Sequence, residues 1–133
     1  MKTPGNPPIA AVTSMETLVE YCYASAFRAL EDGDTETAQR LFGVMAAMAP
    51  RDERAWIGLA MVREGKKQWR AAAGLYGVGT SFAPASAWCH VGKGRNLLRL
   101  GRLIEAEAAF EQAEQLSDDP ELLSALAEGR GLS

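Results

Sequence analysis

A step of 34 residues runs through this sequence and constrains its fold more than any other feature. Three series keep this step: the alanines Ala38, Ala72 and Ala106, the aromatic residues Phe42, Tyr76 and Phe110, and the prolines Pro50 and Pro84. A period of 34 is typical of the tetratricopeptide repeat (TPR), in which each repeat is one helix-turn-helix unit. A small residue allows two helices to cross closely, the aromatic residue one turn later packs into the same seam, and proline ends the unit. The sequence therefore predicts an all-α chain of three TPR repeats.

The repeats are expected at about 19–52, 53–86 and 87–119. Their helices are expected near 16–32 and 35–48, near 53–65 and 68–81, and near 87–100 and 103–116. Stacked units of this kind form a short right-handed solenoid. The proline-broken segment 1–14 is expected to be a flexible tail before a TPR domain over 15–129.

The segment PELLSALAEG, at about 120–129, predicts a C-terminal capping helix. Asp118 or Asp119 would be its N-cap, Pro120 would stand in its first turn and Gly129 would cap its C-terminus. A capping helix is expected because the last repeat would otherwise expose its stacking face.

The turns between the paired helices need a permissive backbone. Gly33 and Gly101 occupy equivalent positions in the first and third repeats. The second repeat has Lys67 there, with Gly65 two residues earlier, so its turn is expected to differ slightly.

The composition excludes several classes of protein. A formal net charge of −3 over 133 residues argues against nucleic-acid binding, which normally requires a basic stripe. Membrane insertion is not expected, since no apolar run approaches the ~18–20 residues that span a bilayer. Two isolated cysteines, Cys22 and Cys89, are expected to be ordinary buried thiols of a cytoplasmic protein.

The first helix of each repeat lines the concave face of such a solenoid, which is its usual binding surface. Repeat positions 5, 9 and 12 project inward, so the groove is expected to be lined by Tyr23, Phe27, Leu30, Ile57, Met61, Glu64, Val91, Arg95 and Leu98. This set is apolar and aromatic, with one acid and one base, and suits an extended polypeptide with spaced hydrophobic anchors. In the alternative interpretation, Tyr23 and Phe27 pack under the N-terminal tail or the capping helix.

No combination of residues supports catalysis, a metal site or a cofactor. His90 is the only histidine, and its neighbour Cys89 points in a different direction on a helix, so neither a metal site nor a Cys-His dyad is expected. The segment 92–95, GKGR, lacks the spacing of a phosphate-binding loop and falls inside a predicted helix. Its two glycines indicate close approach of a helix or a ligand backbone, which fits a groove wall. The chain is therefore not expected to be an enzyme.

Three strings resemble the class II chaperones of bacterial type III secretion systems. They are YASAFRALEDGDTETAQRLF, which begins at Tyr23, RAWIGLAMVREGKKQWRAAAGLYGVG and NLLRLGRLIEAEAAF, and together they span about residues 23–113. The pair Gly58–Leu59 and the pair Tyr76 and Gly79 are more specific to this family than the bare repeat pattern.

The resemblance implies a cytoplasmic, non-enzymatic chaperone. Its groove would hold an extended hydrophobic segment of a translocator protein and keep that protein soluble and export-competent. Pocket walls would come from Tyr23 and Phe27, extended by Ile57, Met61 and Val91. A homodimer is left open, as are two rivals: a chaperone of the needle subunit or an export component, and a general TPR protein-interaction module.

Overall fold

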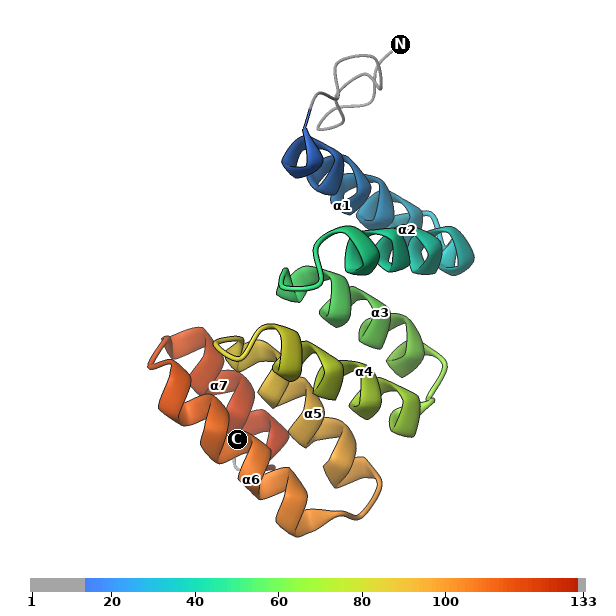
Figure 1. Cartoon of the computed structure of the whole chain (residues 1–133). Coiled ribbons are helices and arrows are strands. Elements are labelled where there is room, and N and C mark those ends of the chain that lie inside the picture. The colour runs from blue at the N-terminus through green and yellow to red at the C-terminus, as the bar shows by residue number, and fades with distance from the viewer. Residues whose placement is uncertain (1–13, 132–133) are drawn as a thin grey trace.

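The structure is a computed structural model that describes residues 14–131. Within them the chain forms seven helices: α1 (Met15–Glu31), α2 (Thr35–Met48), α3 (Glu53–Gly65), α4 (Trp69–Phe82), α5 (Ala87–Arg99), α6 (Leu103–Leu116) and α7 (Pro120–Gly129). Each end lies within one residue of its predicted position. Figure 1 shows these helices stacked in chain order as antiparallel pairs, with α7 beside the last pair. The predicted all-α TPR solenoid is confirmed.

Side-chain caps explain where most of the helices begin. The first backbone N–H groups of a helix have no partner inside it, and a short polar side chain just before the helix can accept a hydrogen bond from one of them. Ser14, Asp34, Asp52, Ser86 and Asp119 do so for α1, α2, α3, α5 and α7. The cap of the last helix is thus Asp119 rather than Asp118. Apart from Ser14, the predicted tail over 1–14 lies outside the described residues.

Aromatic rings packed against glycines hold neighbouring helices together. The Phe42 ring lies over Gly58, and a Cβ built on that glycine would come closer than 3 Å to its ring carbons. The Tyr76 ring has the same relation to Gly92, and the Phe110 ring to Gly94. The two glycines of α5 therefore accommodate the rings of α4 and α6. The prediction that they mark the close approach of another helix is confirmed. They do not form a groove wall, because these rings occupy the space beside them.

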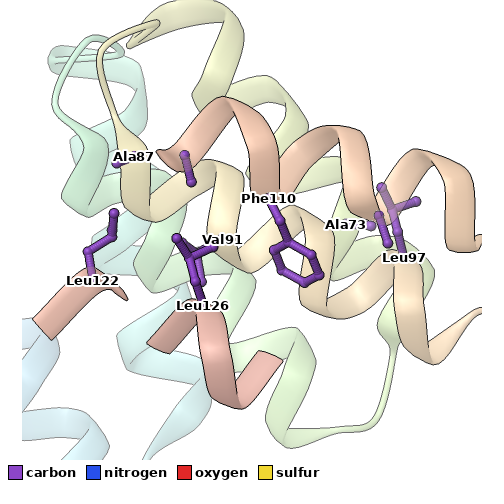
Figure 2. Packing of buried hydrophobic residues seen from close by; sticks show 9 residues of the cluster. Ala73, Ala87, Val91, Leu97, Phe110, Leu122 and Leu126 are labelled. Atoms are coloured by element: carbon purple, nitrogen blue, oxygen red, sulfur yellow. The ribbon is translucent and has the colours of Figure 1, made fainter. Parts of the chain in front are cut away.

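The core consists of separate clusters, each of which includes residues of more than one repeat. One gathers α1, α2 and Ala55 of α3 around Phe42, and another lies around Tyr76 between α3 and α5. The third joins Ala73 of α4, α5 and α6 to α7. Figure 2 shows the third, in which Val91 lies with Phe110, Leu122 and Leu126. Leu122 and Leu126 of α7 are at least 98% buried, so α7 covers the end of the stack as a cap should.

The three turns inside the repeats share one conformation. Gly33, Lys67 and Gly101 have φ values of 77°, 58° and 78°, and each donates its backbone N–H to the carbonyl three residues earlier. The prediction that the second turn differs is wrong: Lys67 adopts the left-handed backbone itself. A side chain in this region costs ~1–2 kcal/mol, which glycine avoids.

Replacing Lys67 by glycine should therefore stabilise the protein. We expect Lys67→Gly to raise the free energy of unfolding by up to about 1 kcal/mol, because relief of backbone strain exceeds the greater freedom of glycine in the unfolded chain. Urea unfolding followed by circular dichroism measures the change. The matched control is Gly33→Lys, which should lower stability by a similar amount. Equal midpoints for both variants and the native chain would contradict the account of the turn.

The effect of replacing a helix glycine by alanine on stability should depend on which atoms lie beside that glycine. Gly92→Ala should lower the free energy of unfolding by about 1–3 kcal/mol, because the added methyl group meets the Tyr76 ring. Gly74→Ala should instead raise it by about 0.4–1 kcal/mol, since Gly74 is exposed in α4 with no atom within 4 Å of the new methyl. Thermal and urea unfolding of the pair measure both signs. The packing account fails if both substitutions stabilise.

Candidate peptide-binding groove

An apolar pocket opens between α1 and α3. It has a volume of about 110 Å³ and is lined by Tyr23, Phe27, Leu30, Phe42, Arg54, Ile57, Gly58 and Met61. Two of these side chains, Phe27 and Met61, are 42% and 45% exposed, although both are large and apolar. Exposed apolar side chains that gather around one hollow are typical of a binding site for another apolar group. We call this hollow the anchor pocket.

Packed aromatic rings shape the anchor pocket. The rings of Tyr23 and Phe27 meet edge to face with centroids 4.9 Å apart, and those of Phe27 and Phe42 do so at 6.4 Å. Phe42 is 1% exposed, so only its edge reaches the pocket. Because Gly58 has no side chain, this ring can lie directly against α3. The packing that joins the first two repeats thus also shapes the pocket.

Arg54 closes one edge of the anchor pocket. Its guanidinium lies 4.4 Å from the centre of the Tyr23 ring. It also donates hydrogen bonds to Asp52, at 2.7 Å from Nη2, and to Glu20 of α1, at 3.1 Å from Nη1. These two bonds lower the pKa of the Glu20 and Asp52 carboxyls. The position of the Tyr23 ring is therefore fixed by a charged network as well as by packing.

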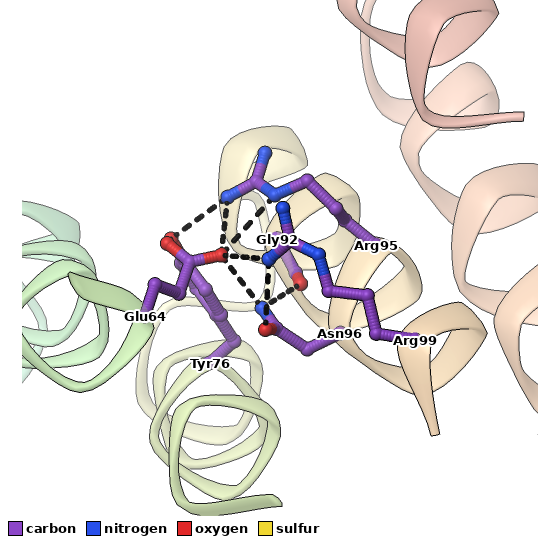
Figure 3. Close-up of polar contacts among 6 residues, drawn as sticks. All are labelled: Glu64, Tyr76, Gly92, Arg95, Asn96 and Arg99. Carbon is purple, nitrogen blue, oxygen red and sulfur yellow. Dashed lines mark hydrogen bonds and ion pairs between the residues drawn. The ribbon is translucent and has the colours of Figure 1, made fainter. Parts of the chain in front are cut away.

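A polar cluster follows the anchor pocket one helical turn along α3. Glu64 Oε2 accepts hydrogen bonds from Arg95 Nη2 at 2.8 Å, from Asn96 Nδ2 at 2.8 Å and from Arg99 Nη1 at 3.4 Å. Its Oε1 accepts one from the Tyr76 hydroxyl at 2.9 Å. Figure 3 shows Glu64 of α3 reaching α4 and α5 in this way. We call these five residues the Glu64 cluster.

Burial keeps the Tyr76 hydroxyl of the Glu64 cluster protonated. Tyr76 is 2% exposed, and its burial, together with the nearby Glu64 carboxylate, raises the pKa of its hydroxyl. The hydroxyl therefore stays protonated and donates to Glu64. Asn96, which is fully buried, donates to the Gly92 carbonyl as well as to Glu64, so its amide hydrogens have partners.

A second hollow lies between α5 and α7. It has a volume of about 490 Å³ and is lined by Arg95, Leu98, Arg99, Ala125, Glu128 and Gly129. Arg95 stands one repeat period after Met61 and two after Phe27, so the same row of the groove changes from apolar to cationic along the chain. We call this hollow the basic hollow.

The structure brings most of the predicted groove residues to these sites. Tyr23, Phe27, Leu30, Ile57 and Met61 share the anchor pocket, Glu64 joins the polar cluster, and Arg95 and Leu98 line the basic hollow. Val91 is the exception. It is 1% exposed and packs in the core with the leucines of α7, so it does not line the groove. The capping helix covers it because α7 packs on α5.

The site also includes three residues that were not predicted from the sequence: Arg54, Asn96 and Arg99. A signal was present in the spacing, because residues one period apart lie side by side on neighbouring first helices. Glu20 and Arg54 are 34 apart and form an ion pair. Arg95 and Arg99 flank the position one period after Glu64, and both contact its carboxylate.

Of the remaining candidate chemical groups, the two cysteines are buried and His90 is partly buried. Cys22 and Cys89 are buried free thiols, as predicted, and burial raises the pKa of each. Burial and the neighbouring Lys93 lower the pKa of His90. Across residues 14–131 no group of three or more His, Cys, Asp or Glu side chains is placed to hold a metal ion. Over the same residues no helix is long and apolar enough to cross a membrane.

Comparison with solved structures reveals chaperones of type III secretion. The Yersinia enterocolitica translocator chaperone SycD, solved with a peptide of the translocator YopD, is 25% identical, with a TM-score of 0.77 over 92% of each chain. A type III secretion complex from Aeromonas hydrophila matches at 26% identity and a TM-score of 0.75, over 96% of this chain and 85% of that one. PcrH from Pseudomonas aeruginosa, at 24% identity and 0.75, covers 95% and 96% and shows the same fold.

These neighbours confirm in structure the resemblance that the sequence indicates. No family model matches the sequence, and no curated protein matches it either. The likeness to SycD extends over nearly the whole of both chains. SycD has also been solved as an alternative dimer.

The charged edge of the anchor pocket predicts a dependence of stability on pH. The folded carboxyls of Glu20 and Asp52 have lowered pKa values, so their contribution is present above their ordinary values of about 4–4.5 and is lost as pH falls below them. Arg54→Met should therefore flatten the fall in stability between about pH 5 and pH 3. Urea unfolding across this range measures the slope.

The exposed Arg70, on α4, provides the control for this test. Arg70→Met removes the same formal charge and should leave the slope unchanged. An unchanged slope in Arg54→Met would show that the network does not contribute to the acid dependence of folding.

Proposed function

We propose that this chain is a cytoplasmic chaperone of a bacterial type III secretion system. Its groove binds an extended, hydrophobic segment of a translocator protein and keeps that protein soluble and competent for export. The observation that carries the proposal is the anchor pocket, an exposed apolar hollow on the concave row of a fold shared with SycD. SycD itself has been solved with a translocator peptide, which supports the same class of client here.

The size of the anchor pocket favours a polypeptide over a small molecule. Sites for drug-sized ligands typically measure about 300–1,000 Å³, whereas this pocket measures about 110 Å³. It suits one apolar side chain presented by a chain that continues on either side. The basic hollow is larger, but its lining is charged. A binding role with no chemical step follows from this arrangement, in agreement with the chaperones that share the fold.

The polar cluster favours an extended client over a helical one. A helix bound in a groove presents a continuous apolar stripe and needs a continuous apolar surface. Here the apolar surface ends at Met61, and Glu64 with its arginine partners follows one turn later. An extended segment can place one apolar side chain in the anchor pocket and pass over the polar cluster. The proposal of a translocator segment therefore fits the groove better than a needle-subunit helix.

Protection of the client's hydrophobic segment requires only moderate affinity of the groove for that segment. A ligand that occupies an aggregation-prone segment lowers the concentration of its free form by mass action. Ordering an extended segment offsets part of the contact free energy, so the complex remains reversible. Reversibility is needed because the client must leave the chaperone before export.

Charged substitutions in the anchor pocket should abolish client binding. Phe27→Asp and Met61→Asp should each weaken binding by roughly 30-fold or more, because the bound client would bury the new carboxylate against its apolar side chain. Translocators encoded beside the chain in its host would be co-expressed with it, and co-purification followed by calorimetry would measure the affinity.

The matched control is Val44→Asp on α2. Val44 is 46% exposed, which is close to the 42% of Phe27 and the 45% of Met61, but it does not line the anchor pocket. This variant should bind the translocator as the native chain does, and circular dichroism should show equal helicity for all three. The proposed function fails if no translocator co-purifies with the native chain, or if Val44→Asp weakens binding as much as Phe27→Asp.

A further inference from the structure

The Glu64 cluster carries more positive than negative charge. Glu64 contributes one carboxylate, and Arg95 and Arg99 contribute two guanidiniums. Tyr76 and Asn96 are neutral partners. The cluster therefore has one formal positive charge that Glu64 does not balance.

The bonds within the cluster saturate Glu64 but not the arginines. Both carboxylate oxygens of Glu64 accept hydrogen bonds, and its side chain is only 14% exposed. The side chains of Arg95 and Arg99 are 36% and 39% exposed. Arg95 Nη1, and Nε and Nη2 of Arg99, take no part in the hydrogen bonds of the cluster. These donors are available to a ligand without breaking the cluster.

Both arginines are held in place before any ligand arrives. Arg95 donates to Glu64 and to the Tyr76 hydroxyl. Arg99 lies over the Trp69 ring, with its guanidinium carbon 4.3 Å from the ring centre. Side chains fixed in this way lose little conformational freedom on binding, so their contacts with an anion contribute more to affinity.

The basic hollow gives an acidic side chain room to reach these donors. Both arginines line it, with Leu98 of the same helix. Glu128 stands on the α7 side of the hollow and forms no ion pair within 4.0 Å with either guanidinium, so it does not neutralise the pair by contact. Its charge should nonetheless oppose an entering anion.

We propose that the groove reads its client at two adjoining subsites, an apolar side chain in the anchor pocket and an Asp or Glu side chain at Arg95 and Arg99. This inference rests on the proposed function and narrows the client to a segment that combines the two. Arg95 and Arg99 reach Glu64 from α5, the next first helix after α3, and packed helices lie ~8–10 Å apart. An extended chain advances ~3.3 Å per residue with alternate side chains on one face. The acid should therefore stand roughly two to four residues from the anchor.

Selection from random peptides tests the motif even while the natural client is unidentified. Short random peptides displayed on phage would be selected on the immobilised full chain and sequenced. The expected result is enrichment of an apolar residue with an acid at the stated spacing. One enriched peptide would then be synthesised with its acid intact or replaced by the matching amide, and fluorescence anisotropy would give both affinities.

A double-mutant cycle, in which the acid of the peptide and an arginine of the protein are changed separately and together, identifies the partner of the acid. The amide peptide should bind the native chain roughly threefold to tenfold more weakly than the acid peptide. Arg99→Gln should remove that difference, whereas Arg40→Gln, at an exposed position on α2, should keep it. Glu128→Gln should increase the difference, because it removes the opposing charge. Circular dichroism would verify that the variants are folded.

The outcomes separate this inference from the proposed function. Peptides enriched in apolar residues without an acid, or an acid preference that survives in Arg99→Gln, would overturn the two-subsite inference and leave the anchor pocket intact. Enriched peptides whose binding is unchanged by Phe27→Asp would instead overturn the proposed groove, and the function with it.

Discussion

One contact between successive repeats determines the rest of this structure. An aromatic ring on the second helix of one repeat packs against a glycine on the first helix of the following repeat. Phe42 over Gly58 and Tyr76 over Gly92 place successive repeats in the same relation. Each ring fills the space that a side chain would otherwise occupy, so the backbones approach closely and the stack propagates. The row of first helices that forms the groove exists because this contact recurs at each junction between repeats.

The groove combines two kinds of surface because one framework carries different side chains at equivalent positions. Phe27, Met61 and Arg95 share a repeat position, yet the first two border an apolar pocket and the third pairs with a carboxylate. The fold thus supplies the same row of positions in every repeat, and the side chains supply specificity. This division is the usual basis on which repeat proteins recognise different partners with one architecture.

The helices could be predicted from the sequence because each signal was local or strictly periodic. The alanine and aromatic series set the frame, and polar caps such as Asp34 and Asp52 mark the starts of helices. Lys67 was misjudged because its residue type disfavours a conformation that the paired helices impose. Val91 was misjudged because its burial depends on the path of α7, which no periodic signal encodes. The Glu64 cluster joins three helices, and its recognition required the stack to be known first.

The separation of the core into distinct clusters has a consequence for cooperativity. The cluster around Phe42 lies mostly in the first repeat, includes Ala55 of α3, and is distinct from the one around Tyr76. In a nearly one-dimensional stack, such units can open independently, and the interface between them sets how strongly their opening is coupled. The anchor pocket takes its walls from both sides of this boundary, with Phe27 on α1 and Met61 on α3. A client side chain bound there would contact both units and couple their opening. Client binding would therefore make the unfolding of the chaperone more cooperative, while the chaperone protects the client.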